Sequence, residues 1–153
     1  MKNSPHGNFD VCLKEAQGCL ETAQWCVRDF ILMPEKMKYP FIINISFACE
    51  LFIKAIMIGG SKSGTFERGH NIKDLFGKLR LDTQKKIQKS YEEKAAGVSF
   101  NESLDRFLSI CQNDFSNWRY AFERNELEAN GSDYLNFAYC LKKYIEISNE
   151  VLE

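Results

Sequence analysis

The longest apolar stretch of the chain runs from Tyr39 to Gly60, and it strongly limits the folds available. The polar residues that interrupt its interior are Asn44, Ser46, Glu50 and Lys54. At about 100° per residue, the last three fall in one narrow stripe along a helix that is otherwise apolar nearly all round. Such a helix belongs in the centre of a bundle, with other helices packed around it.

A transmembrane interpretation of this stretch is less favourable, although the residues from Phe41 to Ile58 approach the length of a membrane span. Glu50 and Lys54 lie in the middle of the segment, where a charged side chain would be costly in a bilayer. Long amphipathic segments also follow it along the chain. We therefore predict a buried core helix and no membrane association.

Helical periodicity covers most of the remaining chain, and no segment alternates for long with the period of two that a strand requires. The patterns predict helices over residues 8–31, 39–60, 72–79, 81–96, 99–122 and 132–152. No internal repeat and no domain boundary is evident, so residues 8–152 should form a single domain. We predict an all-α bundle of four to five long helices plus one short helix.

Residues with capping chemistry set several of these boundaries. Pro34 should end the first helix, because proline disfavours helix in the residue before it and has no N–H to donate. Pro40 should occupy the first turn of the next helix, where proline is tolerated. Asn71 is a good N-cap for the short helix, and Ser99 and Glu102 form a capping box ahead of the following stripe.

The six cysteines do not form a disulfide or zinc pattern. Cys12, Cys19 and Cys26 are seven residues apart on one predicted helix, so neighbours in that column lie about 10 Å apart along the axis. That separation is too large for a disulfide or for two ligands of one zinc ion. We expect buried, reduced cysteines that pack as small apolar residues, and no metal site.

Overall charge and the N-terminal sequence suggest no specialised partner or destination. The formal net charge is −1, so binding to RNA or DNA would need a local basic patch. The first ten residues lack the apolar region of a secretory signal, and we therefore expect a cytoplasmic protein.

Charged residues on predicted core helices are the first candidates for a functional site, because buried charges are costly unless paired. Glu50 and Lys54 are four residues apart in the favoured order. Arg119 and Glu123 lie in the segment WRYAFE, where Arg119 falls at the edge of a buried stripe. Arg119 either joins two helices through a carboxylate or recognises a phosphate. We expect Glu50 and Arg119 to lie within hydrogen-bonding distance.

A histidine and several aromatic residues give further expectations. His70 precedes the Asn71 cap, where it either seats the short helix or acts as a proton carrier or ligand at the mouth of the bundle. Phe137 and Tyr144 fall off the predicted inward face of the last helix, and Trp25 adds a third aromatic. Exposed aromatics at that density indicate a partner surface, so we expect a homodimer.

Three segments in this order resemble the HEPN superfamily of helical bundles: ACELFIKA at residues 48–55, GHNIKDLF at 69–76 and WRYAFE at 118–123. The resemblance implies a small, often dimeric bundle of prokaryotic toxin–antitoxin, abortive-infection and nucleotide-handling systems. Many members are metal-independent ribonucleases whose active site is an arginine followed, four to six residues later, by a histidine. Some also carry a Glu-x-x-x-Lys element, which Glu50 and Lys54 match in form.

The chain departs from that catalytic pattern, because no histidine follows Arg119 at the required spacing and Glu123 stands four residues on. Cleavage through a ribose 2′-hydroxyl needs a proton acceptor, a donor and a cation at the phosphorane. We therefore expect a non-catalytic module, without a cofactor, that binds nucleotide, RNA or a partner protein such as a nucleotidyltransferase or antitoxin. The expected binding residues are Glu50, Lys54, His70, Arg119 and Glu123.

Two alternatives are compatible with the same residues. The first is a metal-independent ribonuclease with an altered catalytic set drawn from Arg119, Glu123 and His70. The second is a purely structural dimeric bundle, in which the polar cluster only holds helices together. Cleavage that persists in EDTA would favour the first alternative. A stable dimer without RNA or nucleotide binding would favour the second.

Overall fold

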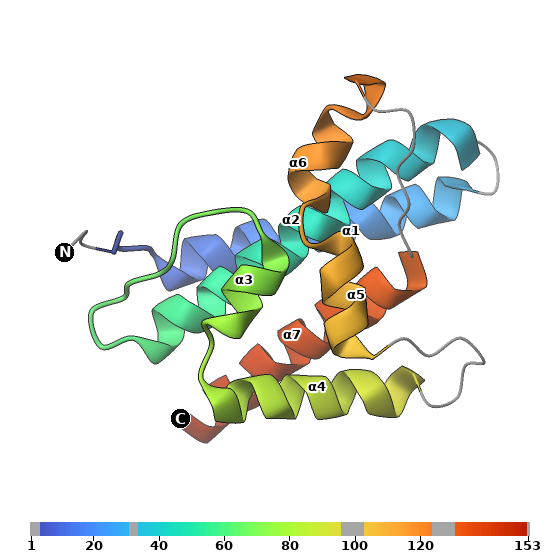
Figure 1. Ribbon diagram of the computed structural model, residues 1–153. Helices are drawn as coiled ribbons and strands as arrows, with labels where there is room; N and C mark the ends of the chain where they lie inside the picture. The colour runs from blue at the N-terminus through green and yellow to red at the C-terminus, as the bar shows by residue number, and fades with distance from the viewer. Residues whose placement is uncertain (1–3, 31–33, 96–102, 124–130, 153) are drawn as a thin grey trace.

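The computed structural model describes residues 4–30, 34–95, 103–123 and 131–152 of the chain. These residues are largely helical, and their one β contact is an isolated antiparallel bridge between His6 and Thr65 (Figure 1). The all-α prediction is therefore confirmed. The elements are α1 (Phe9–Phe30), α2 (Pro34–Gly60), α3 (Ile72–Gly77), α4 (Leu81–Ala95), α5 (Leu104–Cys111), α6 (Asp114–Arg119), the short 3₁₀ helix η1 (Ala121–Glu123) and α7 (Gly131–Leu152).

Helix α2 is the centre of the bundle, as its apolar sequence predicted. Helix α1 packs along it, and α3, α6 and α7 also contact it (Figure 1). Ile45, Phe52 and Ile53 of α2 have no exposed surface. By length and composition alone, the segment Glu35–Gly60 is apolar enough to cross a membrane, but 67% of its most apolar window is buried inside the bundle. The other helices therefore cover most of the apolar surface of α2.

The start of α2 differs from the prediction. The helix begins at Pro34, so this proline opens the central helix and Pro40 lies inside it. Proline is tolerated at the first position because the first N–H groups of a helix have no partner within the helix. Inside the helix, the Asn44 side chain donates a hydrogen bond to the Pro40 carbonyl at 2.8 Å. The buried part of α2 begins directly after Pro40, with Phe41 and Ile42.

Helix α1 contacts α2 through small side chains. Ala16 and Ala23 are completely buried, with Leu20 between them. All six cysteines are free, and the Cys12 thiol donates a hydrogen bond to the Leu51 carbonyl at 3.2 Å. Burial raises the pKa of the Cys12 thiol to about 11, so it is neutral at pH 7. The prediction of buried cysteines holds for Cys26, Cys49, Cys111 and Cys140, whereas Cys12 and Cys19 are half-buried and pack against the core.

An aromatic cluster fills the core between α4, α5 and α7. The Phe107 ring of α5 lies edge-on to Tyr134 and Phe137 of α7, with centroid distances of 5.1 Å and 5.7 Å. Tyr91 of α4 stacks on the same ring at 5.8 Å. These contacts join the consecutive helices α4 and α5 to the C-terminal helix α7.

The predicted partner surface loses one of its three aromatics to this cluster. Phe137 has no exposed surface, so its assignment to an exposed face is wrong. The reason is that α7 contacts both α2 and α4, which buries a wider stripe of the helix than one neighbour would. Tyr144 is half-buried and hydrogen-bonds to the Thr83 hydroxyl at 2.9 Å. Trp25 is 63% exposed, and dimerisation stays a prediction.

The helix predicted over residues 99–122 is divided into α5 and α6. Helix α5 begins after Ser103, whose side chain accepts a hydrogen bond from the Arg106 N–H at 3.2 Å. It ends before Gln112 and Asn113, and α6 starts directly after them. The proposed capping box of Ser99 and Glu102 lies outside the described residues. Arg119 is the last residue of α6.

Truncation of the central aromatic should be costly. Phe107→Ala is expected to destabilise the fold by about 3–5 kcal/mol, because it leaves a cavity among three helices. Phe122 is 83% exposed, and Phe122→Ala should change the stability by less than about 0.5 kcal/mol. Urea unfolding of both variants measures the difference. Equal unfolding midpoints would contradict the aromatic core.

Candidate functional site

Glu50 is a buried carboxylate in the middle of α2, with a histidine and a lysine as neighbours. Its side chain is only 1% exposed. One carboxylate oxygen, Oε1, accepts a hydrogen bond from Nδ1 of His70 at 2.6 Å and lies 3.5 Å from Nζ of Lys54. A buried carboxylate is costly unless it has hydrogen-bonding or charged partners. His70 and Lys54 therefore compensate Glu50 inside the bundle.

Lys54 also fixes the turn that leads to His70. Its ammonium group donates a hydrogen bond to the Gly69 carbonyl at 2.8 Å and lies 5.7 Å from the centre of the Phe66 ring. Gly69 has a φ angle of 111°, a conformation that glycine adopts without a steric penalty. Glu50 thus binds His70, and Lys54, four residues further along α2, binds the residue before it.

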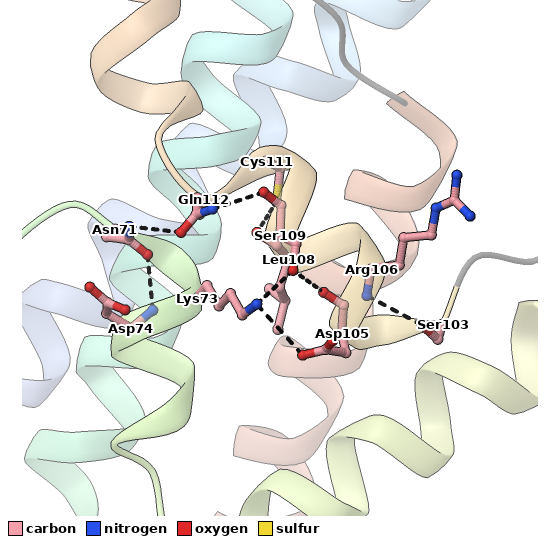
Figure 2. Close-up of polar contacts among 10 residues, drawn as sticks. All are labelled: Asn71, Lys73, Asp74, Ser103, Asp105, Arg106, Leu108, Ser109, Cys111 and Gln112. Atoms are coloured by element: carbon pink, nitrogen blue, oxygen red, sulfur yellow. Dashed lines mark hydrogen bonds and ion pairs between the residues drawn. The ribbon is translucent and has the colours of Figure 1, made fainter.

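The start of α3 is attached to the junction between α5 and α6 (Figure 2). The Asn71 side chain caps α3 by accepting a hydrogen bond from the Asp74 N–H at 2.9 Å, as predicted. Its amide group donates to the side chains of Gln112 at 3.2 Å and Asn113 at 3.3 Å. The Ile72 N–H donates to the Gln112 carbonyl at 3.0 Å. These bonds set the position of His70 relative to the first residues of α6.

A second contact holds α3 against α5. The Lys73 ammonium group donates a hydrogen bond to the Ser109 hydroxyl at 2.6 Å and lies 3.8 Å from a carboxylate oxygen of Asp105 (Figure 2). Because Lys73 is in the first turn of α3, this contact reinforces the attachment made by Asn71. The loop residue His70 is therefore held from both sides along the chain.

Phe115 connects His70 to Arg119. Its ring stacks on Phe47 of α2 with a centroid distance of 4.5 Å. The Arg119 guanidinium carbon lies 4.5 Å from the Phe115 ring centre, in a cation–π contact, and the His70 ring centre lies 5.5 Å from it. These two distances limit the separation between the His70 ring and the Arg119 guanidinium to about 10 Å. An imidazole and a guanidinium group are thus neighbours around one phenyl ring.

Two predicted site residues lie where the sequence did not place them. The hydrogen bond expected between Glu50 and Arg119 is wrong, because Oε2 of Glu50 is buried without a hydrogen-bond partner and Oε1 faces His70 and Lys54. Arg119 is exposed rather than buried, although Phe115 and Trp118 of the same helix are buried. Glu123 is exposed on η1, and among the described residues no contact joins its side chain to this cluster.

The geometry leaves two polar groups available to a ligand. The His70 side chain is 52% exposed, and within the described ranges no hydrogen bond engages its second ring nitrogen, Nε2. The Arg119 side chain is also exposed, on the same Phe115 ring. A guanidinium group donates to an anionic oxygen, and an imidazole held by a carboxylate at Nδ1 can donate from Nε2 when the ring is protonated and accept a proton there when it is neutral.

A second buried carboxylate, Asp114, was missed in the sequence. It is 4% exposed and accepts a hydrogen bond from the Tyr134 hydroxyl at 2.5 Å. Burial raises the pKa of Asp114 from 3.8 to about 6. A signal was present, because Asp114 lies three residues after Cys111 and four before Trp118, both in the predicted apolar stripe. Its bond to α7 anchors the first turn of α6, the helix that carries Arg119.

Comparisons of the chain with protein-family models, curated proteins and solved structures found no match. Within the described part of the chain, no group of three or more His, Cys, Asp or Glu side chains is arranged to hold a metal ion. Glu50, His70 and Arg119 are therefore the residues whose geometry indicates a function.

Substitutions of Glu50 and Arg119 should differ sharply in their effect on stability. Glu50→Ala is expected to cost about 3–5 kcal/mol, because it removes the buried partner of Lys54 and His70. Arg119→Ala should cost less than about 1 kcal/mol, because the side chain is exposed. Chemical denaturation of the two variants provides the measurement. A larger loss for Arg119→Ala than for Glu50→Ala would contradict the assignment of Glu50 as the buried centre.

The raised pKa of Asp114 should make stability depend on pH. Between pH about 4 and 6 the unfolded carboxyl ionises while the folded one keeps its proton, so the parent loses up to about 3 kcal/mol as pH rises. Asp114→Asn, which cannot ionise, should therefore gain stability relative to the parent over that range. Asp10→Asn, at an exposed position in α1, should follow the parent. A constant difference between parent and Asp114→Asn would contradict the shift.

Proposed function

We propose that this chain is a phosphate-recognising helical module that binds RNA or a nucleotide through His70 and Arg119. The observation that carries the proposal is the 2.6 Å hydrogen bond from His70 to the buried Glu50 carboxylate, next to an Arg119 guanidinium seated on Phe115. The buried carboxylate orients the imidazole, and the guanidinium group supplies a planar set of donors that suits phosphate oxygens.

The proposed division of roles follows from exposure. Glu50 and Lys54 are buried or nearly so, and they support His70 without contacting the ligand. His70 and Arg119 are accessible, and their separation of at most about 10 Å suits one phosphate or two neighbouring phosphates of a strand. With a net charge of −1, the chain offers no general attraction for nucleic acid. Binding would therefore depend on this local pair and respond to only a few phosphates.

Membership of the HEPN superfamily is part of the proposal. Its support is the order of the three resembling segments together with one structural fact about them. Glu50 of the first segment hydrogen-bonds to His70 of the second, and the Phe115 ring contacts both His70 and Arg119 of the third. Under this proposal the chain acts as a homodimer in a defence or toxin–antitoxin system, with a nucleotidyltransferase or antitoxin as a partner protein.

Metal-independent RNA cleavage is the second candidate, and the Glu50–His70 pair favours it. A carboxylate that fixes one imidazole nitrogen leaves the other directed to a substrate, which is an arrangement suited to proton transfer. Arg119 would stabilise negative charge on the phosphorane. Cleavage ranks second because it needs both a proton acceptor and a donor, and Glu123 lies outside the cluster.

Fluorescence anisotropy with a labelled single-stranded RNA in EDTA tests binding, and gel analysis of the same samples tests cleavage. His70→Ala and Arg119→Ala are each expected to weaken binding by about tenfold, the loss typical of one charge-assisted contact. His6→Ala, which alters the other histidine, and Lys86→Ala, which removes an exposed charge from α4, serve as controls and should bind like the parent.

The two readouts separate the candidates. Binding without cleavage, weakened in the two site variants, supports the recognition module. Cleavage in EDTA that is lost in His70→Ala moves the ribonuclease to first place. Equal affinity of the parent and both site variants would overturn the assignment of this cluster as the binding site.

A further inference from the structure

A cavity of about 390 Å³ opens where the C-terminal end of α2, the residues that follow it, the α3–α4 connection and α7 meet. Its lining includes none of Glu50, His70, Phe115 and Arg119, so it is separate from the proposed phosphate site. The volume falls within the roughly 300–1,000 Å³ of pockets that hold small molecules. The proposed function does not use this cavity.

Much of the cavity wall is apolar. Ala55 and Met57 come from the last turns of α2, Phe9 from α1, Phe66 from the following loop and Ile145 from α7. Ala55 and Ile145 are buried in the core, so this wall is continuous with the interior of the bundle. An aliphatic or aromatic group would gain by leaving water for this wall.

Two polar residues of the lining already hydrogen-bond to each other. Thr83 and Tyr144 line the cavity, and their hydroxyl groups are joined across α4 and α7 at 2.9 Å. An apolar ligand group can therefore lie against this wall without leaving these two hydroxyl groups unpaired.

Four charged side chains that line the cavity carry both signs. Glu67 and Lys78 form an ion pair at 3.7 Å, and Arg80 and Asp82 form another at 3.4 Å. All four side chains are about half exposed or more, and ion pairs so exposed are weak because water screens them. Each pair can therefore exchange one partner for a charge on a ligand at little cost.

We propose that this cavity binds a small zwitterion with an apolar side chain, an α-amino acid of about leucine or phenylalanine size. A ligand with only a negative charge would gain from Lys78 and Arg80 but would meet Glu67 and Asp82 in the same lining. A ligand with only a positive charge would gain from Glu67 and Asp82 but would be repelled by Lys78 and Arg80. A ligand with both charges satisfies both sets, while its side chain lies against the apolar wall.

Isothermal titration of the full chain with L-phenylalanine and L-leucine tests the proposal. Both should bind with a dissociation constant of about 1 mM or tighter, in keeping with ligands of this size. N-acetyl-L-phenylalanine lacks the ammonium charge and L-phenylalaninamide lacks the carboxylate. Each should bind about fivefold more weakly or worse, because half of the charged lining is then left uncompensated.

Substitutions of charged residues in the lining test whether the amino acid binds in this cavity. Arg80→Ala and Asp82→Ala should each weaken L-phenylalanine binding by about fivefold. Lys89→Ala is the matched control, because Lys89 lies on α4 in an exposed ion pair with Glu93 and does not line the cavity. No heat of binding up to about 10 mM ligand would overturn the proposal. So would equal affinity for either singly charged analogue, or unchanged affinity in both cavity variants.

Discussion

Burial of the Glu50 carboxylate in the central helix is the constraint on which the candidate site depends. A carboxylate with 1% exposure remains in an apolar helix only if other groups compensate it. Lys54, one turn along α2, supplies part of that compensation, and His70 supplies the shortest hydrogen bond. Hydrogen bonds of Glu50 and Lys54 in α2 therefore hold the loop that carries His70 against the core.

Several elements cooperate to keep that bond in place. Asn71 caps α3 and also bonds to Gln112 and Asn113 at the α5–α6 junction. Asp114, the next residue along, is bonded to Tyr134 of α7. The site thus links α2, α3, α6 and α7 through polar contacts, while an aromatic cluster packs between α4, α5 and α7. The accessible His70 and Arg119 side chains are the outermost part of this network.

More of the fold than of the candidate site could be predicted from the sequence. The apolar stretch located α2, and the four-residue spacing of Glu50 and Lys54 placed both on one stripe. No such pattern marks the break between α5 and α6, because Gln112 and Asn113 are not strong helix breakers. Their hydrogen bonds to Asn71 are tertiary contacts between distant segments, which a pattern within one segment does not reveal. Burial of Phe137 likewise depends on α4, which periodicity within α7 does not reveal.

The central claim is that Glu50 holds His70 through Nδ1. NMR correlation of the imidazole nitrogens and their protons in histidine-labelled protein, with the two histidines distinguished by His6→Ala, tests it directly. The account predicts a proton on Nδ1 of His70 that is protected from exchange with water and loses this protection in Glu50→Ala. A His70 ring that carries its proton only on Nε2, unchanged by the loss of Glu50, would contradict it.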